Sequence, residues 1–542
     1  MRPPKILAPG FAFFASLSLL ATGVGTSASP SEAATSTVAS PDASSSAHIQ
    51  PMIRGLDKNS PEAGPGRVAQ GDVIANLWEW NWESIAKECV NVLGPKGYGG
   101  VQVAPPQNSV SLDNVPNKPQ HPWWEVYQPV DYTLDSRMGT EAEFKSMVTA
   151  CRGAGIKVYA DVVINHMARD GSESYGGATF TRYNYPGLYE RADFHSHPED
   201  CPVPLPADPN DENTIWNFND YRQVTNCELL RLPDLRTETN EVQDTLAGYL
   251  NKLINYGVSG FRVDAAKHVP QTDLASIKSR LDRTVDGDTP YFALEVIPGG
   301  PGKLTPHAYQ EVGDLLGFDF AYQVKNAFKS YNPGSPGNIT NLEVFGEDAG
   351  LLPSEKTTVF VQNHDTERGN DTLSYRDGST NTLATQFMLA YGYGTPQVYA
   401  GYAFEGLKVD SPPSDDQGFV TNTDCSKAWA CTHRNTGVAN MVRWHNNAGD
   451  AKLENWYDDE VNLIAFSRGN KGWIAINNHA TDQTQTFQTG MRAGTYCNII
   501  HGDFNNGTCT GPTVQVNKQG EATVTIKSKD SVAFDSNNLI RR

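Results

Sequence analysis

The segment IKVYADVVINH, residues 156–166, is an apolar run that ends in the polar residues Asn165 and His166. Its apolar side chains fall on both faces of an extended chain, as a strand buried in a parallel sheet requires. The same pattern returns in GFRVDAAKH (260–268), YFALEV (291–296) and TTVFVQNHD (357–365). Polar residues at the ends of several buried strands indicate chemistry at one edge of a sheet.

Four further apolar runs complete a set of eight predicted strands: VIANLWEW (73–80), GGVQVAPP (99–106), FDFAY (318–322) and TPQVYAG (395–401). Helical spacing lies between several strands, for example at Phe144, Met147, Val148 and Cys151. Eight strands that alternate with helices predict an α/β fold, the (β/α)8 TIM barrel, with a doubly wound open sheet as the alternative. The barrel is favoured because barrel enzymes keep their chemistry where the strands end.

Changes in composition divide the chain. Residues 1–28 combine a charged start with a short apolar run, which predicts a secretory signal peptide. Residues 29–66 begin rich in Ser, Ala, Thr and Pro, and we expect a disordered or processed linker. The remaining predicted units are a first barrel part (67–166), an inserted irregular B domain (167–240), a second barrel part (241–449) and a C-terminal antiparallel β-sandwich (450–542).

The charge balance narrows the possible partners. The chain has 542 residues, with 43 Lys and Arg against 62 Asp and Glu, and a formal net charge of −19. Because polyanions are held by clusters of Lys and Arg, we expect no nucleic-acid partner. No stretch after residue 28 approaches the ~20 apolar residues of a membrane span, so we expect no membrane anchor. The sequence predicts a secreted, extracellular monomer.

Eight cysteines in an exported chain are compatible with four disulfides. Eight cysteines allow about 100 connectivities, and spacing narrows them only locally. In three predicted pairs, a short polar or turn-rich stretch lies between the two cysteines: Cys201 with Cys227, Cys425 with Cys431, and Cys497 with Cys509. The two remaining cysteines, Cys89 and Cys151, would then pair across a longer stretch of chain. Zinc is the alternative, and it is disfavoured because there is neither a CxxC motif nor a helical His pair.

Three carboxyl groups end three predicted strands. Strand alternation places Arg262 and Asp264 on the same side, and a guanidinium lowers the pKa of a neighbouring carboxyl, which suits a nucleophile. Glu295 ends an apolar strand, where burial would raise its pKa and let it carry a proton to donate. Asp365 follows His364 in the third strand. A structural ion pair or a capping role explains any one acid, but three together indicate a catalytic cavity.

Two carboxyl groups in different environments are the equipment of glycoside hydrolysis. A sugar also needs flat apolar platforms, and HPWWEVYQP supplies Trp123, Trp124 and Tyr127. Adjacent Trp residues of an extended segment cannot both face inward, so we expect at least one to be exposed. The alternative is a core aromatic pair.

Four blocks resemble, in order and spacing, the four signature regions of the α-amylase family of retaining glycoside hydrolases: DVVINH (161–166), GFRVDAAKH (260–268), Glu295 within LEV, and FVQNHD (360–365). The segments PKGYGGVQVAPP, WWEVYQPVDY and YCNIIHGDFNNGTCTG are similar to α-amylases of the animal type, which actinomycetes also carry. The resemblance extends over roughly residues 70–530, and it also supports the four cysteine pairs named above.

The resemblance implies a role for each matching position. Asp264 would be the nucleophile, Glu295 the general acid and base, and Asp365 the third carboxylate, which grips the sugar and stabilises the transition state. The expected substrate-binding residues are Trp123, Trp124, Tyr127, Asp161, His166, Arg262, Lys267, His268 and His364. The expected substrates are starch, glycogen and maltooligosaccharides.

The resemblance also implies a structural Ca²⁺ ion between the barrel and the insertion. Its expected ligands are the side chains of Asn165 and Asp234 and the main-chain oxygens of Thr225 and His268, which are the hard donors that Ca²⁺ prefers. Many relatives of the animal type bind chloride, for which Arg262 and Asn363 match. The third position is the uncharged Gln397, so we expect activity that is unchanged when chloride is dialysed away.

Three functions are compatible with these residues. The first is an endo-acting α-1,4-glucan hydrolase, and the second is a transglycosidase or maltooligosaccharide-releasing enzyme of the same family. The third, from another class, is a non-catalytic carbohydrate-binding protein on the same fold. The presence of Asp264, Glu295 and Asp365 argues against the third function, because a binding protein has no need of all three acids.

Overall fold

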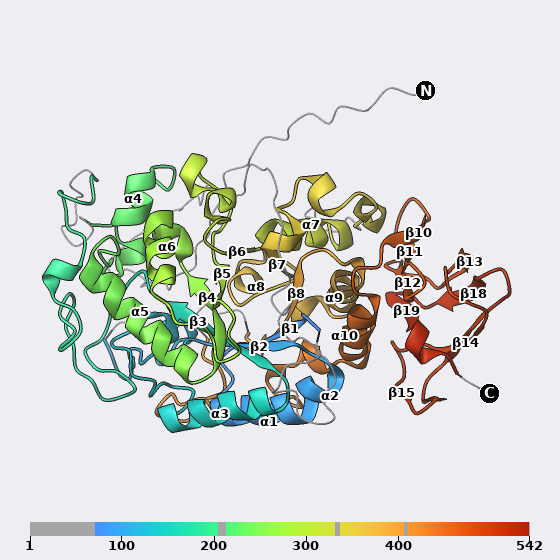
Figure 1. Cartoon of the computed structure of the whole chain (residues 1–542), viewed down its shortest axis with the longest axis horizontal. Helices are drawn as coiled ribbons and strands as arrows, with labels where there is room; N and C mark the ends of the chain where they lie inside the picture. Colours follow the sequence, from blue (N-terminus) through green and yellow to red (C-terminus); the bar gives the residue numbers. More distant parts are fainter. Residues whose placement is uncertain (1–70, 117, 204–212, 331–336, 406–409, 541–542) are drawn as a thin grey trace, which may run out of the picture.

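A closed barrel of eight parallel strands forms the centre of the molecule (Figure 1). The computed structural model describes residues 71–116, 118–203, 213–330, 337–405 and 410–540. Each strand pairs with the next, and β1 pairs with β8 to close the barrel, which confirms the predicted fold. The strands are β1 (Ile74–Leu77), β2 (Gly100–Val103), β3 (Lys157–Val163), β4 (Val258–Asp264), β5 (Tyr291–Leu294), β6 (Asp314–Leu316), β7 (Thr357–Phe360) and β8 (Thr395–Tyr402).

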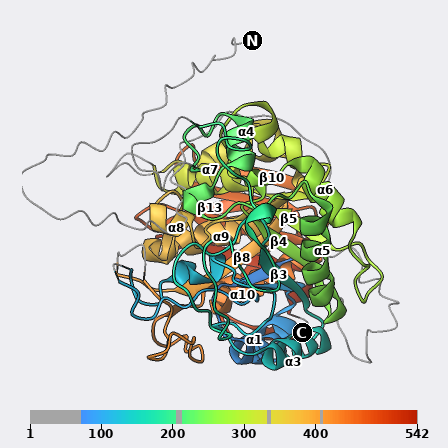
Figure 2. The ribbon, with the colours of Figure 1, turned by 90° about the vertical axis from the view of Figure 1, so that its left-hand side faces the viewer.

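Helices surround the barrel strands, as the view in Figure 2 shows. In α3, the buried face consists of Phe144, Met147, Val148 and Cys151, as their spacing predicts. Thr140 caps this helix and forms a capping box with Glu143, which satisfies free N–H groups at its start. The helices are α1 (Trp82–Glu88), α2 (Gly94–Lys96), α3 (Glu141–Gly153), α4 (Tyr221–Asn226), α5 (Asn240–Asn255), α6 (Gln271–Ser279), α7 (Phe318–Phe328), α8 (Thr366–Gly369), α9 (Ser379–Tyr391) and α10 (Thr436–Ala448).

One predicted strand is wrong. Residues 318–322 begin helix α7, and the sixth barrel strand is the shorter β6, which precedes them. Phe318, Ala321, Val324 and Phe328 are all buried, and their spacing of three to four residues is helical. A short apolar run of five residues does not distinguish the two periodicities, and the helix continues beyond it.

The segment between β3 and α5 is irregular where it is described. It contains α4 and isolated bridges, including one between His166 and Asp234 that joins the end of β3 to the returning chain. The disulfide between Cys201 and Cys227 closes one of its loops. The other three disulfides join Cys89 to Cys151, Cys425 to Cys431, and Cys497 to Cys509, so all four predicted pairings are confirmed.

The C-terminal strands form antiparallel sheets beside α9 and α10 (Figure 1). A four-stranded sheet has the order β10-β11-β12-β19, and three two-stranded sheets accompany it. A common core that includes Trp473, Phe487, Tyr496 and Phe534 lies between them. The strands are β10 (Leu453–Asp458), β11 (Leu463–Arg468), β12 (Gly472–Asn477), β13 (Gln483–Gln488), β14 (Gly494–Cys497), β15 (Phe504–Asn505), β16 (Thr508–Cys509), β17 (Thr513–Val516), β18 (Glu521–Ile526) and β19 (Asp530–Asp535).

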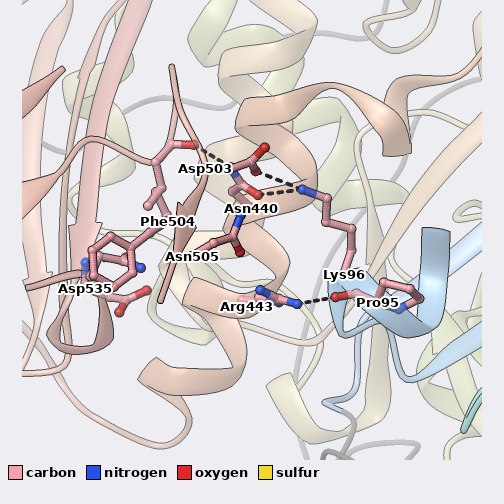
Figure 3. A pocket seen from close by; sticks show the side chains of 10 residues that line it. Pro95, Lys96, Asn440, Arg443, Asp503, Phe504, Asn505 and Asp535 are labelled. Carbon is pink, nitrogen blue, oxygen red and sulfur yellow. Dashed lines mark hydrogen bonds and ion pairs between the residues drawn. The ribbon is translucent and has the colours of Figure 1, made fainter. Parts of the chain in front are cut away.

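Polar contacts join these sheets to the barrel (Figure 3). Lys96 Nζ donates to Asn440 Oδ1 at 3.0 Å and to Asp503 Oδ1 at 3.1 Å. The Asn440 amide donates in turn to the carbonyl oxygens of Ile499 and Gly502. A cavity of about 210 Å³ lies among these residues. It adjoins α2, which precedes the amino end of β2, so it lies away from the carboxyl ends of the strands.

The predicted signal peptide (1–28) and linker (29–66) lie outside the described residues. None of the helices in the described ranges has the length and hydrophobicity of a transmembrane segment.

Candidate active site

Four acidic side chains and one arginine come from the carboxyl-end side of four of the eight barrel strands. Asp161 lies in β3, Arg262 and Asp264 lie in β4, Glu295 follows β5, and Asp365 follows β7. Arg262 and Asp264 are two residues apart in a strand, so both side chains point to the same side, as predicted. The position agrees with the edge of the sheet at which barrel enzymes hold their functional groups.

The guanidinium of Arg262 contacts three of these carboxyl groups. Its Nη1 donates to Asp264 Oδ1 at 2.6 Å and to the two oxygens of Asp161 at 2.9 and 3.1 Å. Its Nη2 lies 2.6 Å from Glu295 Oε1. Because two nitrogens of one planar group hold Asp264 and Glu295, these two carboxyl groups face the same space.

The site contains more negative charge than Arg262 can neutralise. Burial raises the pKa of Asp161 to about 7, against the opposing effect of Arg262. Burial also raises the pKa of Asp264 and of Glu295 above their usual ranges, and Arg262 again opposes it. The expectation of a lowered pKa for Asp264 is therefore wrong, because desolvation outweighs the adjacent guanidinium. Burial therefore opposes the simultaneous ionisation of these carboxyl groups.

Glu295 is fixed by a second contact. Its Oε2 accepts a hydrogen bond of 2.8 Å from the backbone N–H of Ala265, the residue after Asp264. Ala265 has a left-handed backbone, with φ of 48°, which turns the chain sharply at the end of β4. Side-chain exposure is 12% for Asp264, 9% for Glu295 and 18% for Asp365, so all three keep some access to solvent.

Asp365 lies beside an aromatic stack. Its Oδ2 is 3.3 Å from Nε2 of His364. Burial raises the pKa of Asp365 well above its usual range, and the charge of Glu295 adds to this effect, so the two carboxyl groups are neighbours. The His364 ring stacks on Trp78 and on Tyr127, with nearly parallel ring planes and centroid distances of 4.7 and 5.2 Å.

The Trp pair does not have the expected exposure. Trp123 and Trp124 are 1% and 2% exposed. The expectation assumed an extended segment, but Trp123–Tyr127 forms a 3-10 helix, in which adjacent side chains can both be enclosed. Tyr127 donates its OH to Asp161 Oδ2 at 3.0 Å, so this segment supports the carboxyl cluster directly.

The other predicted substrate residues are held by main-chain oxygens. His166 Nε2 lies 3.0 Å from the carbonyl oxygen of Tyr127, and His268 Nδ1 lies 2.9 Å from that of Val224. Lys267 Nζ donates to the carbonyl oxygens of Ile297 and Gly299. Both Lys267 and His268 lie in the short helix after β4, which places them near the nucleophile position.

Sequence analysis missed two residues of this site. Trp78, at the end of β1, stacks on His364 and donates from Nε1 to the Tyr127 OH at 3.1 Å. Arg368, in α8, packs against Trp78 and Trp123. The sequence positions of these residues, directly after β1 and shortly after Asp365, could have identified them, because polar and aromatic residues that follow barrel strands lie on the functional side of a barrel.

Two of the predicted calcium ligands, Asn165 and Asp234, lie close together at the end of β3. Asn165 accepts at its backbone oxygen from the N–H of Leu235, next to Asp234. Asp234 is buried, its Oδ2 lies 2.6 Å from His195 Nδ1, and its Oδ1 accepts no hydrogen bond from the described residues. Within the same described ranges, no group of three His, Cys, Asp or Glu side chains could hold a metal. An amide, one carboxylate and carbonyl oxygens fit Ca²⁺ better than a transition metal.

Gln397 belongs to an uncharged network inside the barrel. Its Oε1 accepts from Asn76 Nδ2 at 3.1 Å, and its Nε2 donates to Gln102 Oε1 at 2.8 Å. Nothing cationic therefore stands at this position, and activity without chloride stays a prediction.

The fold and the site define a barrel hydrolase with paired carboxyl groups, the class to which glycoside hydrolases belong. Comparison with known proteins narrows the class. The chain matches the alpha amylase catalytic domain over residues 114–296 and the alpha amylase C-terminal all-beta domain over residues 454–537. It is 41% identical to an alpha-amylase of Streptomyces violaceus over 466 residues, 86% of this chain and 74% of that protein.

Animal proteins match the chain as well. The pancreatic alpha-amylase of Rattus norvegicus is 36% identical over 501 residues, which cover 88% of this chain and 95% of the relative. The crystal structure of alpha-amylase I from Eisenia fetida has a TM-score of 0.79 and 35% identity, over 85% of this chain and 97% of that one. The chain therefore belongs to the α-amylase family, the endo-acting hydrolases of α-1,4-glucans.

Proposed function

We propose that this chain hydrolyses α-1,4-glucosidic bonds with retention of configuration, with Asp264 as nucleophile and Glu295 as general acid and base. The observation that carries this proposal is the pairing of Asp264 and Glu295 with the two amino groups of Arg262. A retaining mechanism needs its two carboxyl groups about 5 to 5.5 Å apart, and a shared guanidinium keeps them close.

In the first step, a carboxylate oxygen of Asp264 bonds to the anomeric carbon while the bond to the glycosidic oxygen breaks. Glu295 gives its proton to that oxygen, and the leaving chain departs with a free hydroxyl. In the second step, Glu295 takes a proton from water, and the resulting oxygen displaces Asp264 from the same carbon. Asp365 accepts hydrogen bonds from sugar hydroxyls and stabilises the positive charge that develops in both steps.

The substrates proposed are starch, glycogen and maltooligosaccharides. A crystal structure of a glutamate-to-glutamine variant of the Eisenia fetida enzyme is described as a complex with maltohexaose, which supports an oligosaccharide substrate here. We expect the iodine stain of soluble starch to fall rapidly while mixed maltooligosaccharides form as α-anomers. Longer products than the starting maltooligosaccharide, or one dominant small product, would instead indicate the transglycosidase or maltooligosaccharide-releasing alternative.

A calcium ion bound by Asn165, Thr225, Asp234 and His268 would join the end of β3 and the helix after β4 to the insertion. Its bound charge would compensate the buried Asp234 carboxylate and would keep the insertion next to the catalytic carboxyl groups.

Removal of calcium with a chelator should lower both the unfolding temperature and the activity, and added Ca²⁺ should restore them. The reason is that an ion that binds only the folded chain stabilises it by mass action. Asp234→Asn should weaken this response, while Asp244→Asn, an exposed substitution in α5, should leave it unchanged. An unfolding temperature that does not change with chelator would contradict the proposed ion.

We also propose that the chain is exported, with residues 1–28 as its signal, and that its domains follow the predicted division at residues 67–166, 167–240, 241–449 and 450–542. Four disulfides support an oxidising compartment. Mass spectrometry of the protein secreted by its host would test export by locating the mature N-terminus.

A further inference from the structure

Arg368 lies three residues after Asp365 and is enclosed by aromatic rings. The residue is 5% exposed. Its guanidinium carbon lies 4.8 Å from the ring centroids of both Trp78 and Trp123, and 4.4 Å from that of Phe404. Trp78 and Phe404 follow β1 and β8 directly, and Trp123 begins the 3-10 helix in the loop after β2, so Arg368 connects the segment after β7 with three other loops of the barrel.

The hydrogen bonds of Arg368 reach the residue that precedes Asp365. Its Nη1 donates to the backbone oxygen of His364 at 2.6 Å, and its Nη2 donates to the Tyr402 OH at 2.9 Å. The ring of His364 is itself stacked on Trp78. Arg368 therefore holds the same short segment through its main chain and through the aromatic stack.

Glu79 is a buried acid that interacts electrostatically with Arg368 and with Arg137. Glu79 follows Trp78 in a left-handed conformation, with φ of 56°, and is completely buried. Neither of its carboxyl oxygens accepts a hydrogen bond from the described residues. Burial raises the pKa of Glu79 to about 8, and Arg137 and Arg368 are the cations that oppose this increase. Nothing in the proposed reaction uses Glu79.

We infer that Arg368 is a positioning residue, which holds Asp365 and His364 in their working place against the aromatic platform of Trp78 and Trp123. This inference rests on the role proposed for Asp365. Arg368 touches neither the anomeric carbon nor the reacting carboxyl oxygens in this account; it acts through the backbone of His364. A planar guanidinium can stack its flat face on rings while its edge donates in two directions, whereas the ammonium of Lys has donors but no flat face to stack.

Arg368→Met should lower kcat by about 10- to 100-fold, because small displacements of a group that acts in the transition state have effects of this size. The matched control is Arg376→Met. Arg376 stacks on the same Phe404 ring and donates to the backbone oxygen of Phe404. Its substitution by Met therefore removes a contact similar to the one that Arg368 makes. The control should keep the kcat of the original protein when both are assayed well below their unfolding temperatures.

The conservative variant keeps the test valid if Arg368→Met does not fold. Arg368→Lys retains a positive charge beside Glu367, whose Oε1 lies 3.4 Å from Arg368 Nη1, so it should fold, yet it should recover only part of kcat. A Lys variant with the original kcat would show that charge alone suffices and would overturn the positioning role.

A double variant separates positioning from general stability. If Arg368 acts through Asp365, then Arg368→Met should cause no further loss of kcat when Asp365 is already Asn. Losses that add fully in the double variant would refute the inference. If Asp365→Asn alone leaves kcat unchanged, the role proposed for Asp365 has failed. This outcome differs from a failure of the positioning role, in which Asp365→Asn lowers kcat and Arg368→Met lowers it further.

Discussion

Glu295→Gln is expected to lower the turnover of starch by about 10²- to 10⁴-fold, the contribution that a positioned acid and base makes. Gln has the same shape and can still accept the hydrogen bond from Ala265, but it has no proton to give to the glycosidic oxygen. Substrate binding should therefore survive. The measurements are kcat on soluble starch and maltooligosaccharide affinity by calorimetry.

The pH profile gives the same prediction a second readout. Glu295 must be protonated to act as an acid, so the rate falls as pH rises through its pKa. Because burial raises that pKa above the ordinary value of 4.5, the alkaline limb should lie above that value. With an aryl maltoside whose leaving group needs no proton, Glu295→Gln should lose less activity and should lack this limb.

The control for this substitution is Asp535→Asn. Asp535 is also a buried carboxyl, with a pKa raised by burial to about 7, but it lies in the C-terminal sheet. Its neutralisation should leave kcat unchanged. If Glu295→Gln has the same small effect as Asp535→Asn, Glu295 is not the acid.

Asp264→Ala is expected to reduce kcat by about 10⁴-fold or more, the scale on which other hydrolases lose activity without their nucleophile. The truncated side chain leaves space beside the anomeric carbon, and azide can occupy it. Azide nitrogen would then bond to that carbon as the glycosidic bond breaks and Glu295 supplies the proton. The product should be a β-glycosyl azide, because one displacement inverts the α-linkage.

Asp264→Ala should not lower the stability of the protein, although it lowers kcat. Asp161, Asp264 and Glu295 share a single guanidinium, so removal of one carboxyl relieves repulsion. We expect the unfolding temperature of Asp264→Ala to be unchanged or higher, as is common when a functional site is strained. An α-glycosyl azide, or no azide product with full residual activity, would contradict the assignment of Asp264.

Much of the architecture could be predicted because the relevant signals are local. Buried parallel strands produce apolar runs of recognisable length, and α3 shows a clear helical period. The prediction of the sixth strand was wrong for the same local reason. The three residues of β6 are too few to establish a period, whereas the adjacent segment Phe318–Phe328 has a stronger apolar pattern. The predicted exposure of the Trp pair was wrong because the sequence does not distinguish a 3-10 helix from an extended loop.

The site could be predicted only in part. Asp264, Glu295 and Asp365 end recognisable strands, but their net electrostatics depend on how many neighbours share Arg262 and on how deeply they are buried. These are properties of contacts between distant segments. Arg368 and Glu79 are similar cases, because Arg368 packs on rings from three other loops of the barrel and Glu79 is unusual only through its surroundings.

The seam between the first and last barrel strands has a consequence for biogenesis. Ile74 of β1 lies opposite Gln397 of β8, so the ladder that completes the cylinder joins segments more than three hundred positions apart. Contacts of such long range form slowly, and until they form, the edges of both strands stay available to other chains. A nascent polypeptide lacking β8 has every proposed catalytic carboxyl but no closed cylinder. Until β8 has been made, the edge of β1 therefore lacks its barrel partner and is open to pairing with other chains.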